Sequence, residues 1–279
     1  MRPEPIGAPG VKPRPESFRK RKIILVPHLR HWVHAKLRLR WSPDTIARKM
    51  ALEYPQDTTM RLSPEAMYTY LYVLPKGALK KELLACLRRE RKRRHPRRKS
   101  GAEPVVKGKI EDMLSIEERP AEVAERTVPG HWEGDLLVGR NRQSFLGSLV
   151  ERTTRTTILI PLRNKTAQEV RQAFAREAKR LPAHLRLSMT YDQGLEMAQH
   201  KLFTQETHMQ VYFAHPGSPW ERGTNENTNG MIRQFFPKGT DFSKVSRREV
   251  KRVQHLLNGR PRKVLAYATP YEVFHSLLR

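Results

Sequence analysis

The order of short apolar runs downstream of residue 129 constrains the fold of this 279-residue chain more than any other feature of its sequence. Five runs rich in β-prone residues occur there, at 130–139, 144–151, 156–162, 185–191 and 210–214. A helical pattern capped by Thr166 separates the third run from the fourth, and further helical segments lie between the fourth and fifth and after the fifth. This order is typical of an α/β fold, a mixed five-stranded sheet with helices on both faces.

A small helical domain is predicted ahead of the sheet, over residues 27–86. Two Ser-Pro-acid sequences, at 42–44 and 63–65, each provide an N-cap, a proline at the first helical position and an acid on the helix dipole. Two short capped helices are compatible with a helix-turn-helix-like DNA-binding domain whose second helix enters the major groove. The intervening loop, 55–62, is longer than the usual turn, and a helical bundle without DNA contact is the alternative.

Two polar segments flank this helical domain. Residues 1–26 are rich in proline, glycine and charge, so we expect a flexible basic arm. Residues 87–128 are predicted to form a basic linker, entered from a helical pattern over 79–94. The linker residues expected to follow a phosphate backbone are Arg91, Lys92, Arg93, Arg94, Arg97 and Arg98. Such contacts carry little sequence preference and make binding steeply salt-dependent, whereas a merely solvated linker is the alternative.

The overall charge narrows the class of partner. Lys and Arg total 54 against 28 Asp and Glu, and the formal charge of +26 indicates a polyanionic partner, first of all nucleic acid. A membrane surface fits less well because the apolar segments are short. Cys86 is the only cysteine, which excludes an intramolecular disulfide and a thiolate metal cluster. No signal-peptide or membrane-spanning pattern is present, so we expect a cytoplasmic, nucleoid-associated protein without membrane contact.

Three acids stand where the predicted elements could bring them together. Asp135 lies in the first strand, Asp192 ends the fourth, and Glu226 follows after 33 intervening residues on a helix predicted over 220–236. Hard carboxylate oxygens delivered by two strands and a helix suit two Mg²⁺ ions, with Mn²⁺ as the alternative. Each acid alone also has an ordinary interpretation: a surface Asp, an Asx-turn and a solvated helix Glu.

The sequence around these acids strengthens the metal-site interpretation. The segments HWEGDLLVG, LVERTTR, YDQGLEM, SPWERGTNENTNGMIRQFFPKGTD and NGRPRKVL closely resemble the family-30 insertion-sequence transposases, bacterial enzymes with an Asp-Asp-Glu catalytic core. The resemblance covers the chain from about Trp41 to its C-terminus. It implies a ribonuclease-H-like catalytic domain, here expected over 129–279, in which Asp135, Asp192 and Glu226 are the metal ligands.

The chain departs from the family pattern just ahead of the predicted helix. His215 stands where an Asp is expected, Gly217 where His or Tyr is expected, and Glu221 where Gln is usual. These changes bear on the local loop geometry more than on the chemistry.

Further residues are predicted to support the three acids. We expect Asn225 and Asn227 to orient Glu226, while Glu133, two residues from Asp135 on the same strand face, is the rival metal ligand. The residues expected to contact DNA are Arg233, which faces the same way as Glu226, Trp220, and a basic turn of Arg260, Arg262 and Lys263. A solvated Arg233, a core position for Trp220 and an ordinary solvated loop are the respective alternatives.

The sequence therefore predicts a DNA transposase that cleaves element ends and joins their 3′-hydroxyls to target DNA. Its expected partners are double-stranded DNA, as terminal repeats and target, and further copies of the chain, since two ends must be joined in one synapse. Relatives usually carry a helix-turn-helix ahead of the region that starts here near Trp41, and only a short basic arm precedes it in this chain. A truncated, non-catalytic regulator of transposition is therefore the main alternative, and a nuclease without strand transfer is a weaker one.

Overall fold

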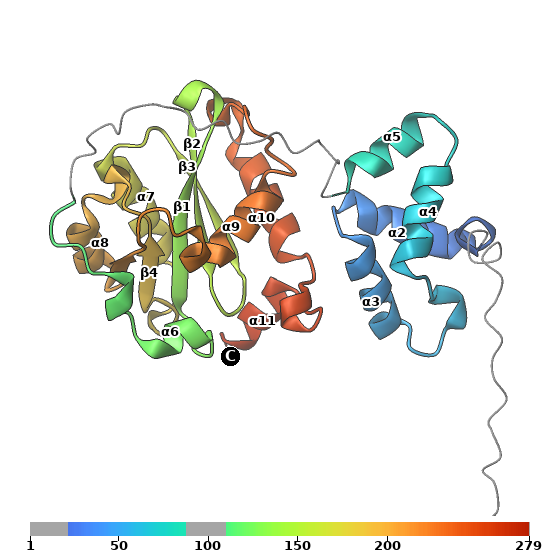
Figure 1. Cartoon of the computed structure of the whole chain (residues 1–279), viewed down its shortest axis with the longest axis horizontal. Helices are drawn as coiled ribbons and strands as arrows, with labels where there is room; N and C mark the ends of the chain where they lie inside the picture. The colour runs from blue at the N-terminus through green and yellow to red at the C-terminus, as the bar shows by residue number, and fades with distance from the viewer. Residues whose placement is uncertain (1–21, 88–109, 279) are drawn as a thin grey trace, which may run out of the picture. The chain divides into compact units, whose positions relative to one another are not determined.

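The structure, a computed structural model, describes residues 22–87 and 110–278 (Figure 1). The chain divides into two compact units, and each has its own apolar core. We refer to the described residues 22–87 as the helical unit and to 110–278 as the sheet unit. The linker residues predicted to follow DNA, Arg91 to Arg98, lie outside the described ranges.

The helical unit is built from short helices that begin at the predicted caps. They are α2 (Pro27–Arg38), α3 (Pro43–Glu53), α4 (Pro64–Val73) and α5 (Ala78–Ala85). The hydroxyl oxygens of Ser42 and Ser63 accept the backbone N–H groups of Thr45 and Ala66, each at 3.2 Å. Leu29, Val33, Ile46, Met50, Met67 and Leu71 are among the fully buried residues of its core.

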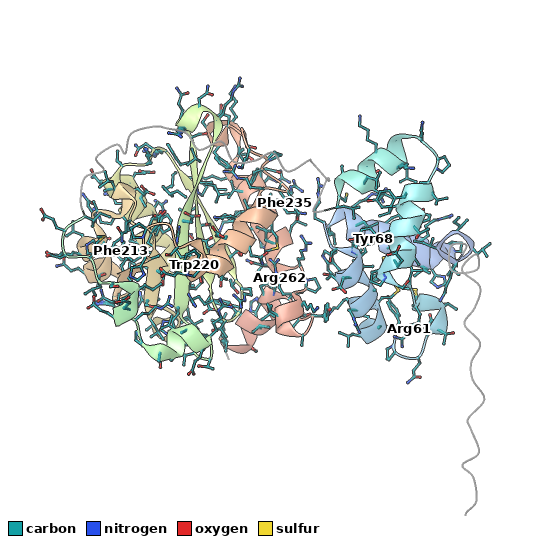
Figure 2. All side chains as sticks on the ribbon, in the orientation of Figure 1. Arg61, Tyr68, Phe213, Trp220, Phe235 and Arg262 are labelled. Atoms are coloured by element: carbon teal, nitrogen blue, oxygen red, sulfur yellow. The ribbon has the colours of Figure 1, made fainter. Side chains whose placement is uncertain are left out.

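Two features of this unit differ from the expectations. Ile23 is fully buried in the core and the Lys22 ammonium donates to the carbonyl of Arg61, so the packed unit starts before residue 27. Helix α4, expected to enter the major groove, contains no Lys or Arg. It exposes Tyr72 and also Tyr68, which is labelled in Figure 2. The helical fold is confirmed, whereas a groove-reading role for α4 stays a prediction.

The sheet unit contains the predicted five strands. They are β1 (His131–Val138), β2 (Phe145–Glu151), β3 (Thr157–Leu162), β4 (Ser188–Tyr191) and β5 (Gln210–Phe213). Their order across the sheet is β3-β2-β1-β4-β5. The first three pair antiparallel, and β4 and β5 run parallel to β1. This mixed sheet is the predicted ribonuclease-H-like fold.

Helices cover both faces of the sheet, as predicted (Figure 1). One face packs on α7 (Ala167–Ala178) and α8 (His200–Thr207), and the other on α9 (Gly223–Ile232) and α10 (Arg247–Asn258). The remaining helices of the unit are α6 (Ala121–Glu125) and α11 (Pro270–Ser276). Short 3-10 turns of the chain lie at Thr58–Met60, Ile116–Glu118, Arg140–Arg142, Ala183–Leu185, Leu195–Met197, Pro219–Arg222, Phe242–Lys244 and Lys263–Leu265.

Strand alternation decides which residues of β1 meet α9. Trp132 packs in the core on the α7 side, whereas Leu137 belongs to the core on the α9 side. Because side chains alternate along a strand, Glu133 and Asp135 share the face of Leu137. Two carboxylates of β1 therefore point toward α9.

Two predicted boundaries in the sheet unit are wrong. The packed unit begins upstream of residue 129, because Ile110 and Val123 are buried and Ser115 forms a β-bridge with Phe213. The helix predicted over 220–236 is shorter at both ends, since a 3-10 turn precedes α9 and the helix stops at Ile232. Within the described ranges, no helix combines the length and the apolar character needed to cross a bilayer.

Candidate active site

The parallel pairing of β1 with β4 brings Asp135 and Asp192 to the same edge of the sheet. Glu133 is in register with Thr190, and each aspartate lies two residues further along its own strand direction. One guanidinium joins them: Arg222 Nη1 lies 3.4 Å from Asp135 Oδ1, and Nη2 donates to Asp192 Oδ2 at 3.3 Å. The two predicted aspartates therefore share a single cation.

The electrostatics of Asp135 reflect its position at this edge. Burial raises the pKa of its carboxyl, and the neighbouring Asp192 raises it further, while Arg222 opposes the shift. The side chain of Asp135 is 24% exposed and that of Asp192 is 44% exposed, so both carboxylates still reach solvent. A carboxylate pair that is accessible and repulsive favours a cation between its members.

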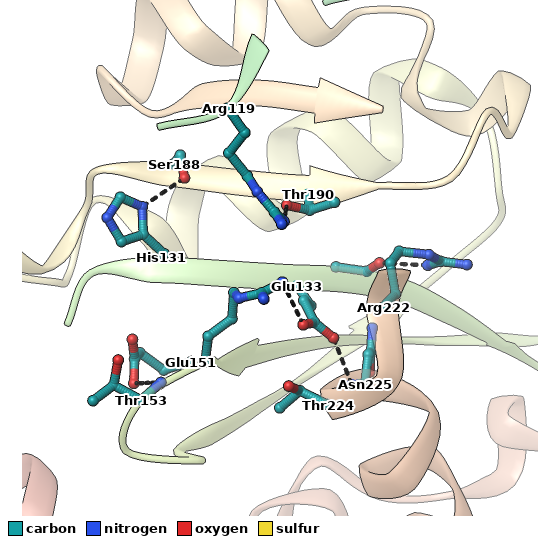
Figure 3. Close-up of polar contacts among 12 residues, drawn as sticks. Arg119, His131, Glu133, Glu151, Thr153, Ser188, Thr190, Arg222, Thr224 and Asn225 are labelled. Atoms are coloured by element: carbon teal, nitrogen blue, oxygen red, sulfur yellow. Dashed lines mark hydrogen bonds and ion pairs between the residues drawn. The ribbon is translucent and has the colours of Figure 1, made fainter. Parts of the chain in front are cut away.

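Helix α9 is fixed against β1 by the other carboxylate of that strand. Glu133 is fully buried and accepts a hydrogen bond from Arg152 Nη1 at 2.9 Å. It also accepts the backbone N–H of Asn225 at 2.7 Å (Figure 3). That N–H belongs to the first turn of α9, where backbone donors have no partner within the helix. Glu133 therefore positions the helix, and its two partners occupy the oxygens that a metal ligand would need.

A second contact orients Asp135 itself. Asn229, one turn further along α9, donates from Nδ2 to Asp135 Oδ2 at 2.5 Å. The buried Ser148, which pairs with Asp135 across the β1-β2 ladder, donates to Asn225 Oδ1 at 3.2 Å. Helix α9 thus presents two asparagine side chains to the sheet: that of Asn229 contacts Asp135, and that of Asn225 contacts the neighbouring Ser148.

Glu226, predicted as the third metal ligand, is exposed on the surface of α9. It precedes Asn229 by three residues, which makes the two side chains neighbours along the helix surface and places Glu226 beside the residue that contacts Asp135. Across the described ranges, no three His, Cys, Asp or Glu side chains stand close enough to hold a metal together. The role of Glu226 as third ligand stays a prediction.

The donor set nonetheless fits a divalent cation. Asp135 and Asp192 offer hard oxygen atoms from adjacent strands, and the Arg222 guanidinium already stands between them as a cationic substitute. Glu196 is a further acid of this region: burial raises its pKa first, and the charges of Asp192 and Asp135 add to the shift. Sequence reasoning singled out the two aspartates but gave no role to Arg222 or Glu196.

The residues predicted to contact DNA have different environments. Arg233, the C-cap of α9, donates from Nη2 to the Val138 carbonyl at 2.9 Å, at the end of β1. Trp220 is 73% exposed, which excludes the core alternative (Figure 2). Arg233 therefore lies against the end of β1, whereas Trp220 presents most of its surface to solvent.

The predicted basic turn is largely buried. Arg260 is 6% exposed and donates to Gln234 Oε1 at 2.9 Å, and Arg262 is 8% exposed and donates to the Leu257 carbonyl at 2.9 Å. Lys263 is the exposed member of the set. The alternative of an ordinary solvated loop is therefore wrong for the two arginines, because they donate hydrogen bonds inside the fold, and their contact with DNA stays a prediction.

The two asparagines predicted to support Glu226, Asn225 and Asn227, lie on different sides of α9. Asn225 is buried and contacts Ser148 as described, whereas Asn227 lines a cavity of about 290 Å³ together with Arg126 and Arg155. Asn227 lies two residues from Asn229, which places it on the opposite side of the helix. The sequence predicted that Asn225 and Asn227 orient Glu226, and that role stays a prediction. It assigned no role to Asn229, which contacts Asp135.

Two departures from the family pattern turn out to contact each other. His215 Nδ1 lies 2.8 Å from Glu221 Oε1, and the His215 backbone N–H donates to Glu221 Oε2 at 2.8 Å. This hydrogen bond, with the Glu221 charge, raises the pKa of His215. Gly217, the third departure, has a φ of 75°, a conformation that glycine adopts without strain. The contact between His215 and Glu221 therefore joins the two ends of this loop.

Comparison with known proteins agrees with this geometry. The integrase core domain family matches residues 125–219, a range that includes both aspartates. The transposase of insertion sequence element IS1086 from Cupriavidus metallidurans is 42% identical over 90% of this chain and 72% of its own length. The transposase of IS30A from Escherichia coli is 42% identical over 88% of this chain and 64% of its own length.

A third relative is more distant and covers more of the chain. The transposase of IS4351 from Bacteroides fragilis is 33% identical over 95% of this chain and 78% of its own length. The matches extend well beyond the integrase core range, and they coincide with a sheet whose order brings two acids to one edge. The chain belongs to the insertion-sequence family 30 transposases.

Proposed function

We propose that this chain cleaves the ends of an insertion element and joins the freed 3′-hydroxyls to target DNA. The observation that carries the proposal is the pair of accessible carboxylates, Asp135 and Asp192, which converge from adjacent strands around one cation. Glu226 would complete the site from the flank of α9 that also carries Asn229. The family of this chain supports the reaction type.

Two Mg²⁺ ions, with Mn²⁺ as the alternative, would be held by Asp135, Asp192 and Glu226 and would stabilise the attacking and leaving oxygens of an in-line phosphodiester displacement. Asn229 keeps one oxygen of Asp135 fixed through its amide. Glu133 keeps the first turn of α9 on the sheet and so limits the distance over which Glu226 can move. No side chain has to act as the nucleophile.

DNA contacts are supported by charge and exposure near the site. Trp220 is exposed two residues ahead of Arg222, where an aromatic ring can stack on an unpaired base. Lys263 adds an exposed cation in the sheet unit, and α2 and α3 carry basic residues in the helical unit. We expect double-stranded DNA as the partner and at least two copies of the chain in the synapse, because two ends are joined.

A strand-transfer assay tests this proposal. The purified full chain is incubated with a labelled element end, target plasmid and Mg²⁺, beside the variants Asp192→Ala and Glu226→Ala. We expect joined products from the unchanged chain only, with DNA retardation kept in both variants. Glu249→Gln is the matched control, since this acid pairs with Arg252 on α10 away from the site. If all proteins retard DNA equally and none cuts it, the catalytic proposal fails and a non-catalytic regulator replaces it.

A further inference from the structure

Arg222 occupies a position in the site that no other basic residue among the described ones shares. Its side chain is 14% exposed and contacts three groups: the carboxylates of Asp135 and Asp192 and the carbonyl of Gly134, to which Nη1 donates at 3.0 Å. A planar guanidinium is suited to this arrangement because its donors form a rigid fork. The side chain makes no capping hydrogen bond to α9 although Arg222 is the N-cap residue.

The four oxygens of the two aspartates are divided in a regular way. On Asp135, Oδ2 accepts the neutral amide of Asn229, and Oδ1 faces Arg222. On Asp192, Oδ1 accepts the backbone N–H of Gly194 at 3.2 Å, and Oδ2 faces Arg222. Each carboxylate is therefore oriented by a neutral donor through one oxygen and neutralised by Arg222 through the other.

We propose that Arg222 is an exchangeable counter-cation. It neutralises the charges of Asp135 and Asp192 before metal binds. When a divalent ion enters, the guanidinium moves away from Asp135 Oδ1 and Asp192 Oδ2. The inference rests on the proposed function, because it takes these aspartates as metal ligands. Arg222 acts through the ligands and is a positioning residue: the neutral contacts from Asn229 and Gly194 persist and keep both carboxylates oriented during the exchange.

If Arg222 is exchanged in this way, removing its charge should tighten the binding of a divalent ion. A divalent ion entering the unchanged chain must displace or face a positive charge, and that cost is absent once the charge is removed. If Arg222 instead served only to preorganise the aspartates, its removal would weaken metal binding. The direction of the change therefore separates the two roles.

The test is the dissociation constant for Mn²⁺, measured by titration calorimetry on the full chain without DNA. We expect Arg222→Gln to bind Mn²⁺ about tenfold more tightly than the unchanged chain, since the loss of a charge-assisted contact to a carboxylate is worth roughly that factor. Arg222→Lys should fall between the two, because one ammonium cannot span both carboxylates as a guanidinium fork does.

Arg252→Gln is the matched control. It removes the same charge from α10, where the exposed Arg252 forms its ion pair with Glu249 rather than with an aspartate of the site. We expect its Mn²⁺ affinity to change by less than about threefold, because solvent screens a charge at this exposed position.

A second readout guards against a folding defect. The melting temperature of Arg222→Gln should lie below that of the unchanged chain without metal, and Mn²⁺ should raise it by a larger increment. An affinity that is unchanged or weaker in Arg222→Gln overturns the exchange and leaves the proposed function intact. A complete lack of Mn²⁺ binding by the unchanged chain overturns the proposed function and this inference with it.

Discussion

The two ends of the contact between β1 and α9 use carboxylates in opposite ways. At one end, Glu133 is fully buried and bound by Arg152 and by the first turn of the helix. At the other, Asp135 is 24% exposed and shares Arg222 with Asp192. The two acids lie on the same strand face, with Gly134 between them in the sequence. Residue type and spacing therefore do not distinguish a structural carboxylate from a candidate metal ligand. The number of fixed partners and the access of solvent do.

The largest effect should follow from removing the charge of Glu133, at the buried end of the contact. Glu133→Gln leaves the Arg152 guanidinium buried without its carboxylate and weakens the hold on Asn225, so we expect the sheet unit to lose about 3–5 kcal/mol of unfolding free energy. Chemical denaturation followed by circular dichroism measures the loss. Asp135→Asn is the control, and its stability should change by about 1 kcal/mol or less, because its ion pair is partly solvated. Equal stabilities for the two variants would contradict the distinction between the ends.

Gly134, the residue between the two acids, offers the next largest effect. A Cβ built on Gly134 would lie 2.7 Å from Cδ2 of the fully buried Tyr191, on the strand that leads to Asp192. Gly134→Ala should therefore push β1 away from β4 and cost about 1–3 kcal/mol of unfolding free energy, as overpacking does. Strand transfer should fall as well, since the spacing of the aspartates changes.

The matched control for this prediction is Gly223→Ala. No atom lies within 4 Å of a Cβ built on Gly223 at the start of α9. We expect this variant to be as stable as the unchanged chain or slightly more so, because alanine reduces the freedom of the unfolded chain. A Gly134→Ala protein with an unchanged melting temperature would show that the strands tolerate the extra methyl group.

Asn229→Ala should affect the solvent-accessible acid alone. It removes the neutral donor that orients Asp135 and leaves the contacts of the buried Glu133 in place. We expect the rate of strand transfer to fall about tenfold, as for other residues that orient metal ligands. Asn227→Ala, on the opposite flank of α9, is the control and should keep its rate. Similar losses in both variants would point to a general defect of the helix.

The smallest effect concerns pH. His131 is 3% exposed, and burial lowers its pKa from 6.5; its Nδ1 contacts Ser188 Oγ at 2.8 Å and so links β1 to β4. The unfolded chain takes up the proton first as the pH falls below about 6.5, so the stability supplied by neutral His131 is lost between that pH and its lowered folded pKa. His131→Asn should lose less unfolding free energy between about pH 7 and pH 5 than the unchanged chain. Parallel stability profiles for the two proteins would contradict this assignment.

Much of the fold could be predicted because it depends on local signals. Ser42, Ser63 and Thr166 cap helices through hydroxyl contacts to a backbone N–H three residues ahead, and each contact lies within one turn. The apolar runs likewise gave all five strands, although β4 begins three residues later than expected. Their order placed Asp135 and Asp192 on neighbouring strands before any side-chain position was known.

The roles of polar residues could not be predicted in the same way. Glu133 has the type and spacing of a metal ligand, but its partners Arg152 and Asn225 are 19 and 92 residues away. Arg260 and Arg262 have the composition of a phosphate-binding turn, yet packing buries both and directs them to internal acceptors. A charged side chain takes its role from whichever groups the fold brings to it, and those groups are remote in sequence.

The helical unit, the mixed sheet, the family and the convergence of two aspartates could be predicted from the sequence, because caps, periodicity and strand order act over short distances or follow from connectivity. Four features emerged only from the folded arrangement: α9 starts at Gly223, Glu133 secures it, Asn229 orients Asp135, and Arg222 stands between the two aspartates. These outcomes depend on burial and on contacts between elements far apart in the chain. Local patterns do not encode either of them.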